Sequence, residues 1–284
     1  MRTRTAGVGA GRLTFDEWPR EESPVVLFLH GNGVARGVWR PIAEQIAGRG
    51  HAVALDCRGH GGSWKPAPPE PYRWTAIADE IVALIEAERW SPLVICGHSL
   101  GGGMAIDIGV RYPRLAAALV LIEPILAYQP LDDESWPRVH AMATRAAGRR
   151  AEWGSVEEAS AYLRQRFPYS AWLPEAFEGF VATALEPHDG GVRLACPPPV
   201  EAAIYDAGDS FTPFSQLSQL ACPTWIAQSP EGNDGSRRED GDPVSRIPGL
   251  RRTLVEGTGH FLACERFDIP VELLHEALDT IERA

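Results

Sequence analysis

The chain has 284 residues, with 27 Lys and Arg against 38 Asp and Glu, so its formal net charge is −11. A chain this acidic is not held on nucleic acid or on an anionic membrane by a general positive field, although a local basic cluster such as Arg145, Arg149 and Arg150 would oppose the overall charge. With 44% hydrophobic residues, its length fits one large α/β domain, or a core that carries an insertion.

The predicted elements begin with alternating strands and helices in the first 123 residues. Four short apolar runs are each followed by Gly or polar residues, which is typical of strands buried on both faces of a parallel sheet. These runs are Val25–His30, His51–Asp56, Leu93–His98 and Ala117–Glu123. Helical periodicity lies between them, at Pro41–Ala47 and Trp74–Ala87. The alternation predicts an open, mostly parallel sheet flanked by helices.

The rhythm changes after Glu123 and returns near residue 222. The intervening residues are rich in aromatic residues, Pro and Ala, with helical stretches at Trp136–Arg149 and Val156–Arg166 but no strong strand. The strand-like runs CPTWIAQ and LRRTLV and a helix near Pro270–Arg283 follow. We therefore predict an α/β core of residues 1–124 and 213–284, with a helical cap of residues 125–212 inserted after the sixth strand.

Targeting and metal-binding patterns are missing from the sequence. The first residues contain no 7 to 15 residue apolar run, and no 18-residue apolar stretch occurs, so we expect a cytoplasmic protein. The histidines are scattered, and the five cysteines lack metal-ligand spacing, so we expect buried thiols and no metal. The cysteines are Cys57, Cys96, Cys196, Cys222 and Cys264.

The strongest local motif is Gly97-His98-Ser99-Leu100-Gly101. A G-x-S-x-G motif is a nucleophile elbow only where it joins a strand to a helix, and here it follows LVIC and precedes GGMAIDIGV. Close backbone packing at such a turn leaves no room for side chains beside the serine, which explains both glycines. We predict that Ser99 is exposed at the tip of this turn as a nucleophile.

Three further motifs accompany the elbow in order along the chain. They are His30-Gly31-Asn32-Gly33, Asp56-Cys57-Arg58-Gly59-His60-Gly61 and Gly257-Thr258-Gly259-His260-Phe261. Together with the elbow, these motifs resemble those of the α/β-hydrolase family over almost the whole chain. The resemblance implies that His260 is the general base for Ser99, and that Asp56, Arg58, His30 and His60 support loops.

The acid of the triad has three candidates. The family's usual aspartate position, after the seventh strand, falls here on Gly232, with Glu231 and Asp234 nearby. Some family members carry a glutamate at the end of the sixth strand instead, and Glu123 stands there, so we favour Glu123 and keep Asp234 and Glu231 as alternatives. A purely structural Glu123, paired with a residue of the cap, is the competing interpretation.

The oxyanion hole is expected from two backbone N–H groups. Leu100 begins the helix after the elbow, and Asn32 lies in the loop that resembles the family's oxyanion loop. Trp39 is expected to pack behind that loop without a chemical role.

These residues predict a serine hydrolase that cleaves an ester or lactone of a small apolar substrate through an acyl-enzyme. No metal or organic cofactor is needed, and neither nucleic acid nor membrane is an expected partner. A carbon–carbon bond hydrolase or a thioesterase would use the same triad. A non-catalytic small-molecule-binding member of the fold is the alternative from another functional class.

Overall fold

The computed structural model describes residues 1–21, 23–68, 72–126, 135–208, 214–230 and 243–283. Within these residues the main sheet has the strand order β1-β2-β4-β3-β5-β6-β10-β11. Neighbouring strands from β4 to β11 in this order are parallel, whereas β2 pairs antiparallel with β1 and β4. The strands are β1 (Arg2–Val8), β2 (Gly11–Trp18), β3 (Val25–Leu29), β4 (His51–Asp56), β5 (Leu93–His98), β6 (Ala116–Ile122), β10 (Thr224–Gln228) and β11 (Arg251–Leu254).

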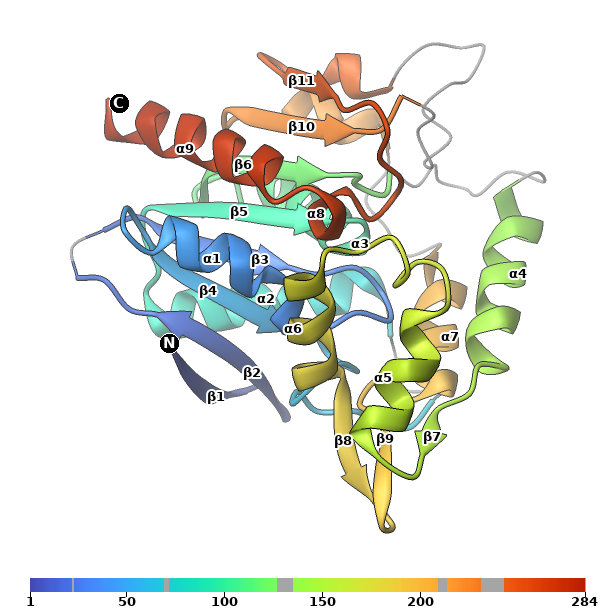
Figure 1. The fold of residues 1–284 in the computed structure, drawn as a ribbon. Coiled ribbons are helices and arrows are strands. Elements are labelled where there is room, and N and C mark those ends of the chain that lie inside the picture. Colours follow the sequence, from blue (N-terminus) through green and yellow to red (C-terminus); the bar gives the residue numbers. More distant parts are fainter. Residues whose placement is uncertain (22, 69–71, 127–134, 209–213, 231–242, 284) are drawn as a thin grey trace.

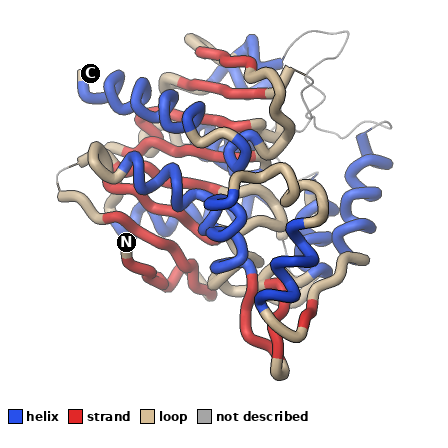
Figure 2. Tube along the Cα trace, viewed as in Figure 1, coloured by secondary structure: helices blue, strands red, loops and turns tan. Residues whose placement is uncertain are grey.

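Helices cover both faces of this sheet (Figures 1 and 2). Leu27 and Leu29 of β3 belong to a buried cluster that includes α2 and α3, and Val26 and Phe28 belong to one that includes α1 and α9. Burial on both sides explains why the strands are uninterrupted apolar runs, and it confirms the predicted α/β class. The covering helices are α1 (Arg40–Ile46), α2 (Trp74–Glu88), α3 (Leu100–Arg111) and α9 (Asp268–Glu282).

The N-terminal hairpin of β1 and β2 is an addition to the predicted elements. Val8 pairs with Gly11 across a two-residue turn, and Gly9 has φ +54°. The residues of β1 alternate in burial, since this edge strand packs on one side only, whereas β2 is buried from Leu13 to Trp18. This pattern lacks the continuous apolar run by which the parallel strands were found.

The inserted segment, residues 135–208, lies beyond the carboxyl ends of the parallel strands (Figure 1). Helices occur where predicted, and a three-stranded antiparallel sheet in the order β7-β9-β8, which the sequence did not predict, joins them. Its strands have two to four residues, too short for a periodic signal in the sequence. The elements are α4 (Ser135–Ala147), β7 (Glu152–Trp153), α5 (Val156–Arg164), α6 (Pro174–Ala184), β8 (Leu185–His188), β9 (Gly191–Leu194) and α7 (Pro198–Asp206).

Short elements complete the chain around the strand ends. The α-helix α8 follows the loop that carries His260, and the 3₁₀ helix η1 follows the loop after β3. Their bounds, with the other 3₁₀ helices, are η1 (Arg36–Trp39), η3 (Phe214–Gln219), η4 (Pro243–Arg246) and α8 (Leu262–Glu265).

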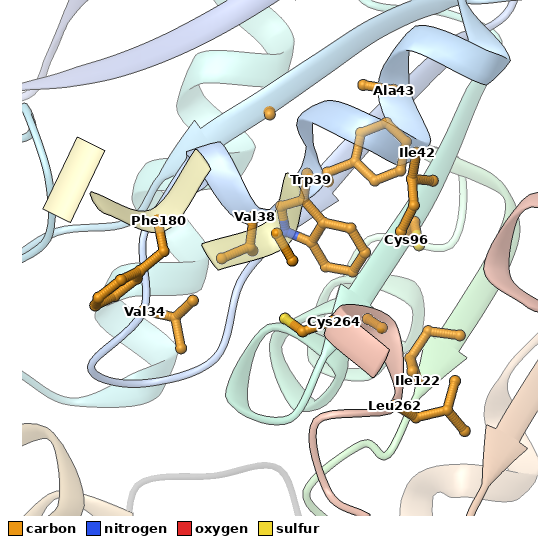
Figure 3. Packing of buried hydrophobic residues seen from close by; sticks show 14 of the residues in the cluster. Val34, Val38, Trp39, Ile42, Ala43, Cys96, Ile122, Phe180, Leu262 and Cys264 are labelled. Carbon is orange, nitrogen blue, oxygen red and sulfur yellow. The ribbon is translucent and has the colours of Figure 1, made fainter. Parts of the chain in front are cut away.

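The inserted segment packs directly on the core at Gly37 of η1 and Gly179 of α6. A β-carbon added at either glycine would collide with the backbone carbonyl oxygen of the other. The Gly37 N–H also donates to the Thr183 hydroxyl at 3.1 Å. Figure 3 shows Phe180 of α6 beside Val34, with Trp39 fully buried behind the loop after β3, as predicted.

Candidate active site

The nucleophile elbow forms where β5 meets α3. Ser99 has φ 54° and ψ −119°, a backbone conformation that residues other than glycine rarely adopt. Such strained conformations are typical of functional turns. A β-carbon at Gly97 would collide with the backbone of Gly101, and one at Gly101 would collide with the carbonyl of Leu29. Both glycines are therefore required by the close approach of strand, turn and helix.

Ser99 and His260 are brought together from positions 161 residues apart. His260 Nε2 lies 2.9 Å from Ser99 Oγ, which is hydrogen-bond distance for a base and its nucleophile. The loop that carries the imidazole is held at two other points, since Thr258 Oγ1 donates to the Val255 carbonyl at 2.8 Å and the Gly259 N–H donates to Glu265 Oε2 at 2.9 Å. This arrangement can transfer a proton from the hydroxyl to the imidazole.

His98, inside the elbow, contacts the same histidine loop. Its Nε2 lies 2.7 Å from the backbone carbonyl of His260, and since a carbonyl only accepts, Nε2 carries the proton. Burial, together with the neighbouring His260, lowers the pKa of His98 to about 3. His98 is therefore a neutral donor that connects the nucleophile turn to the backbone of the base.

The loop after β3 lies against the elbow. A β-carbon added at Gly31 would lie 3.1 Å from the Ser99 β-carbon. The Gly33 N–H donates to His60 Nε2 at 3.0 Å, and the Cys57 N–H donates to His30 Nε2 at 3.1 Å. Burial lowers the pKa of both histidines, so they support the loops as neutral acceptors, as predicted.

Asn32 joins this loop to the inserted segment. Its Nδ2 donates to the backbone carbonyl of Glu201 at 3.0 Å. Among the described residues, no acceptor is bound to the backbone N–H of Asn32, the group predicted for the oxyanion hole. Leu100 is the first residue of α3, where backbone N–H groups have no partner within the helix.

Glu123 directly follows β6, the strand beside β5. The Ser99 N–H donates to the Ile122 carbonyl at 3.1 Å, which places the backbone of Glu123 next to the elbow. Its carboxylate is 1% exposed and accepts a hydrogen bond from the Ser229 N–H, after β10, while its φ of 45° is unusual for a glutamate. The alternative acids Glu231 and Asp234 lie outside the described residues.

Asp56 and Arg58 have structural partners. Asp56 Oδ1 accepts from the Arg36 N–H, and Oδ2 accepts from the Gly62 N–H, each at 2.8 Å. Arg58 Nε donates to Glu80 Oε2 at 2.9 Å. These bonds connect the turn after β4 to its surroundings, which agrees with the loop-supporting roles that the motif implied.

The sequence did not reveal a polar cluster formed by Arg149, Tyr169 and Glu201. Arg149 donates to Glu201 Oε2 and to the Tyr169 hydroxyl, at 2.7 Å in each case. A β-carbon at Gly33, which has φ +71°, would lie 2.5 Å from Glu201 Oε1, so the cluster lies directly on the loop after β3. We call these three residues the Arg149 cluster. Their spacing along the chain follows no motif, so only the fold could identify them.

Two of the three arginines that would form a local basic cluster are paired with carboxylates. Arg149 pairs with Glu201, and Arg150 pairs with Glu158 at 2.5 Å. Among the described residues no group of three or more His, Cys, Asp or Glu side chains could hold a metal ion. No helix in the described ranges has the length and apolar character needed to cross a membrane.

Comparisons with known proteins give one family. A model of the alpha/beta hydrolase family matches residues 26–266. The 2-(acetamidomethylene)succinate hydrolase of Mesorhizobium japonicum is 29% identical over 189 residues, covering 66% of this chain and 63% of that protein. The pimeloyl-[acyl-carrier protein] methyl ester esterase of Chromobacterium violaceum is 33% identical over 137 residues, covering 48% and 50%. These matches span about half to two thirds of the length of the curated relatives.

Solved structures are similar over almost the whole chain. The crystal structure of an E-2-(acetamidomethylene)succinate hydrolase has a TM-score of 0.83 at 23% identity, covering 98% of this chain and 99% of that one. The thioesterase domain from the curacin biosynthetic pathway has a TM-score of 0.77 at 22% identity, covering 97% and 99%. At these identities the similarity concerns the fold.

Proposed function

Because the chain belongs to the α/β-hydrolase family, we propose that it is a serine hydrolase that cleaves an ester or lactone of a small substrate through an acyl-enzyme. The observation that carries this proposal is the 2.9 Å contact between Ser99 Oγ and His260 Nε2 at a strained elbow. The esterase of Chromobacterium violaceum, by its name, acts on a methyl ester and supports the choice of bond.

In the proposed reaction, Ser99 Oγ attacks the substrate carbonyl while His260 Nε2 takes the hydroxyl proton. Backbone N–H groups of Asn32 and Leu100 stabilise the oxyanion of the tetrahedral intermediate. His260 then gives the proton to the leaving alcohol, and the acyl group remains on Ser99. Water, deprotonated by His260, attacks the acyl-enzyme and releases the acid.

We assign the acid of the triad to Glu123. A buried carboxylate next to the elbow, on a residue with φ 45°, suits a group that orients and stabilises the imidazolium of His260. We also propose that residues 125–212 form a cap over a core of residues 1–124 and 213–284. The contact of Glu201 with Gly33 supports a cap that covers Ser99 and excludes water.

The test is the rate at which an organophosphonate ester labels the purified protein, followed by intact mass and peptide mapping. We expect labelling at Ser99 that is lost in Ser99→Ala and slowed at least about 100-fold in Glu123→Gln, because a misoriented imidazole cannot accept the proton. The matched Asp234→Asn variant should label at the wild-type rate.

Three outcomes would change these assignments. Slow labelling in Asp234→Asn with normal labelling in Glu123→Gln moves the acid to the loop after β10. A protein that binds small esters without labelling or product release is a non-catalytic member of the fold. Turnover of thioesters or carbon–carbon bonds alone, with Ser99 still labelled, replaces the ester bond but keeps the site.

A further inference from the structure

The Arg149 cluster contains a buried hydroxyl proton whose acceptor is absent from the described chain. A guanidinium can only donate, so the Tyr169 oxygen is the acceptor in its 2.7 Å contact with Arg149. Tyr169 is 7% exposed, and its hydroxyl forms no second hydrogen bond within the described residues. Burial raises the pKa of Tyr169, so its proton stays in place at neutral pH. A buried donor without an acceptor is costly, and native structures rarely keep one without a reason.

The other two residues of the cluster also have unused hydrogen-bonding groups. Arg149 has five N–H donors, and two of them bind Glu201 and Tyr169. Glu201 Oε2 accepts one of these bonds, whereas Glu201 Oε1 lies beside Gly33. The side chain of Arg149 is 21% exposed, so part of the cluster reaches solvent.

The cluster bridges the two sides of the catalytic site. On one side Glu201 contacts Gly33, two residues from the Gly31 that lies against Ser99. On the other side the Tyr169 ring is 4.9 Å from Trp172, which is 5.4 Å from Phe261, the neighbour of His260. The cluster is therefore linked by packing both to the loop beside Ser99 and to the loop that carries His260.

The charge of the cluster indicates what it binds. Glu201 forms an ion pair with Arg149. Burial lowers the pKa of the Arg149 guanidinium, but Tyr169 and Glu201 raise it by more, so the guanidinium stays charged. A substrate carboxylate would leave two negative groups around one buried cation, an unfavourable arrangement. An uncharged oxygen can accept the Tyr169 proton and an Arg149 N–H at no such cost.

We propose that the Arg149 cluster is a substrate subsite that binds an uncharged oxygen, a carbonyl or hydroxyl, on the acyl part of the ester. This inference rests on the proposed hydrolase function and refines it, since the sequence alone predicted an apolar substrate. Tyr169 is the residue that discriminates between an oxygen-bearing acyl group and its alkyl counterpart.

The experiment compares methyl esters of matched length by following methanol release. Methyl 4-oxopentanoate and methyl 5-oxohexanoate are compared with methyl pentanoate and methyl hexanoate, and monomethyl succinate supplies a carboxylate. The wild type should show kcat/KM about tenfold higher for at least one oxo ester than for its alkyl counterpart, the size expected for one or two hydrogen bonds. Monomethyl succinate should be the poorer substrate.

The Tyr169→Phe variant removes the hydroxyl and keeps the packed ring. We expect it to lose the preference for the oxo ester while its kcat/KM for the alkyl ester stays within about twofold of wild type. A purely structural tyrosine would lower both values alike. The matched control is Tyr162→Phe in α5, whose ring packs under Arg166 at 3.4 Å and should leave the preference unchanged.

Several results would overturn the subsite. One is the same preference for the oxo ester over the alkyl ester in the wild type and in Tyr169→Phe. Another is a wild type that prefers neither oxo ester over its alkyl counterpart. A third is a wild type that prefers monomethyl succinate, which would make the ligand a carboxylate. The proposed function fails separately, when the organophosphonate does not label Ser99. Normal labelling with no oxo preference rejects the subsite and retains the hydrolase.

Discussion

The core edge at Ser99 and the inserted segment that lies on it are held together in different ways. At the core edge the close contacts join backbone to backbone, as where Gly101 meets the carbonyl of Leu29, and its buried histidines bond to backbone groups. In the inserted segment many polar contacts join side chains from distant positions, such as Arg149 and Glu201. Backbone contacts require particular residues, usually glycine, at fixed places, whereas side-chain pairs can be formed in many ways.

The sharpest test of this difference compares Gly101→Ala with Gly179→Ala. In both variants the new methyl group meets a backbone carbonyl, but Leu29 is fixed within the main sheet, whereas α6 can move away from η1 as part of the inserted segment. We expect Gly101→Ala to lose about 4 kcal/mol or more of unfolding free energy and Gly179→Ala about 2 kcal/mol. Urea denaturation measures both.

Gly48→Ala is the control for this pair, because nothing lies within 4 Å of a β-carbon there. Its stability should match the wild type. Equal losses at Gly101 and Gly179 would contradict a core edge that is more rigid than the inserted segment.

A smaller effect concerns the buried histidines of the core edge. The pKa of His98 is about 3 in the folded chain, well below the value of about 6.5 for an unfolded histidine, so the unfolded chain binds the proton more readily. Stability from this group is present above pH 6.5 and is lost as the pH falls. At pH 5 the loss is about 2 kcal/mol for His98. His98→Gln should remove that part of the pH dependence, measured by denaturation between pH 7.5 and 5.

The matched variant in the inserted segment is His140→Gln. The His140 side chain is 61% exposed, so its replacement removes little buried contact and should leave the denaturation midpoint at pH 7.5 as in the wild type. An unchanged pH dependence in His98→Gln would show that the acid sensitivity does not originate at the elbow.

The smallest effect is expected at the outer surface of the inserted segment. The side chains of Arg150 and Glu158 are 42% and 49% exposed, so water and salt screen their ion pair. Arg150→Gln should leave the denaturation midpoint and the preference among esters unchanged. A clear loss in either measurement would mean that this surface contributes to the structure of the Arg149 cluster.

The same difference explains what the sequence could and could not predict. The parallel strands, the elbow and the pairing of Ser99 with His260 were predictable, because continuous apolar runs and glycine-flanked motifs follow from backbone geometry. The hairpin of β1 and β2 and the small sheet of β7, β9 and β8 were not, since an edge hairpin and four-residue strands carry little periodicity.

The candidate site divides in the same way. Ser99 and His260 stand in motifs that could be recognised, whereas Arg149, Tyr169 and Glu201 come from the turn after α4, the loop before α6 and the middle of α7. No local pattern connects three such positions. The sequence predicted an apolar substrate, whereas the folded chain places the charged pair of Arg149 and Glu201 against the loop after β3.

The mutual contact of Gly37 and Gly179 also limits how the chain can be recombined with other members of the family. Exchange of the inserted segment would leave Ser99 and His260 in place, because both residues lie outside it. Here η1 and α6 approach so closely that a segment taken from another member of the family must have glycine at position 179. Without that glycine, the backbone of α6 would be displaced away from η1. A chimera made without that match would change the depth of the binding space before any lining residue is altered.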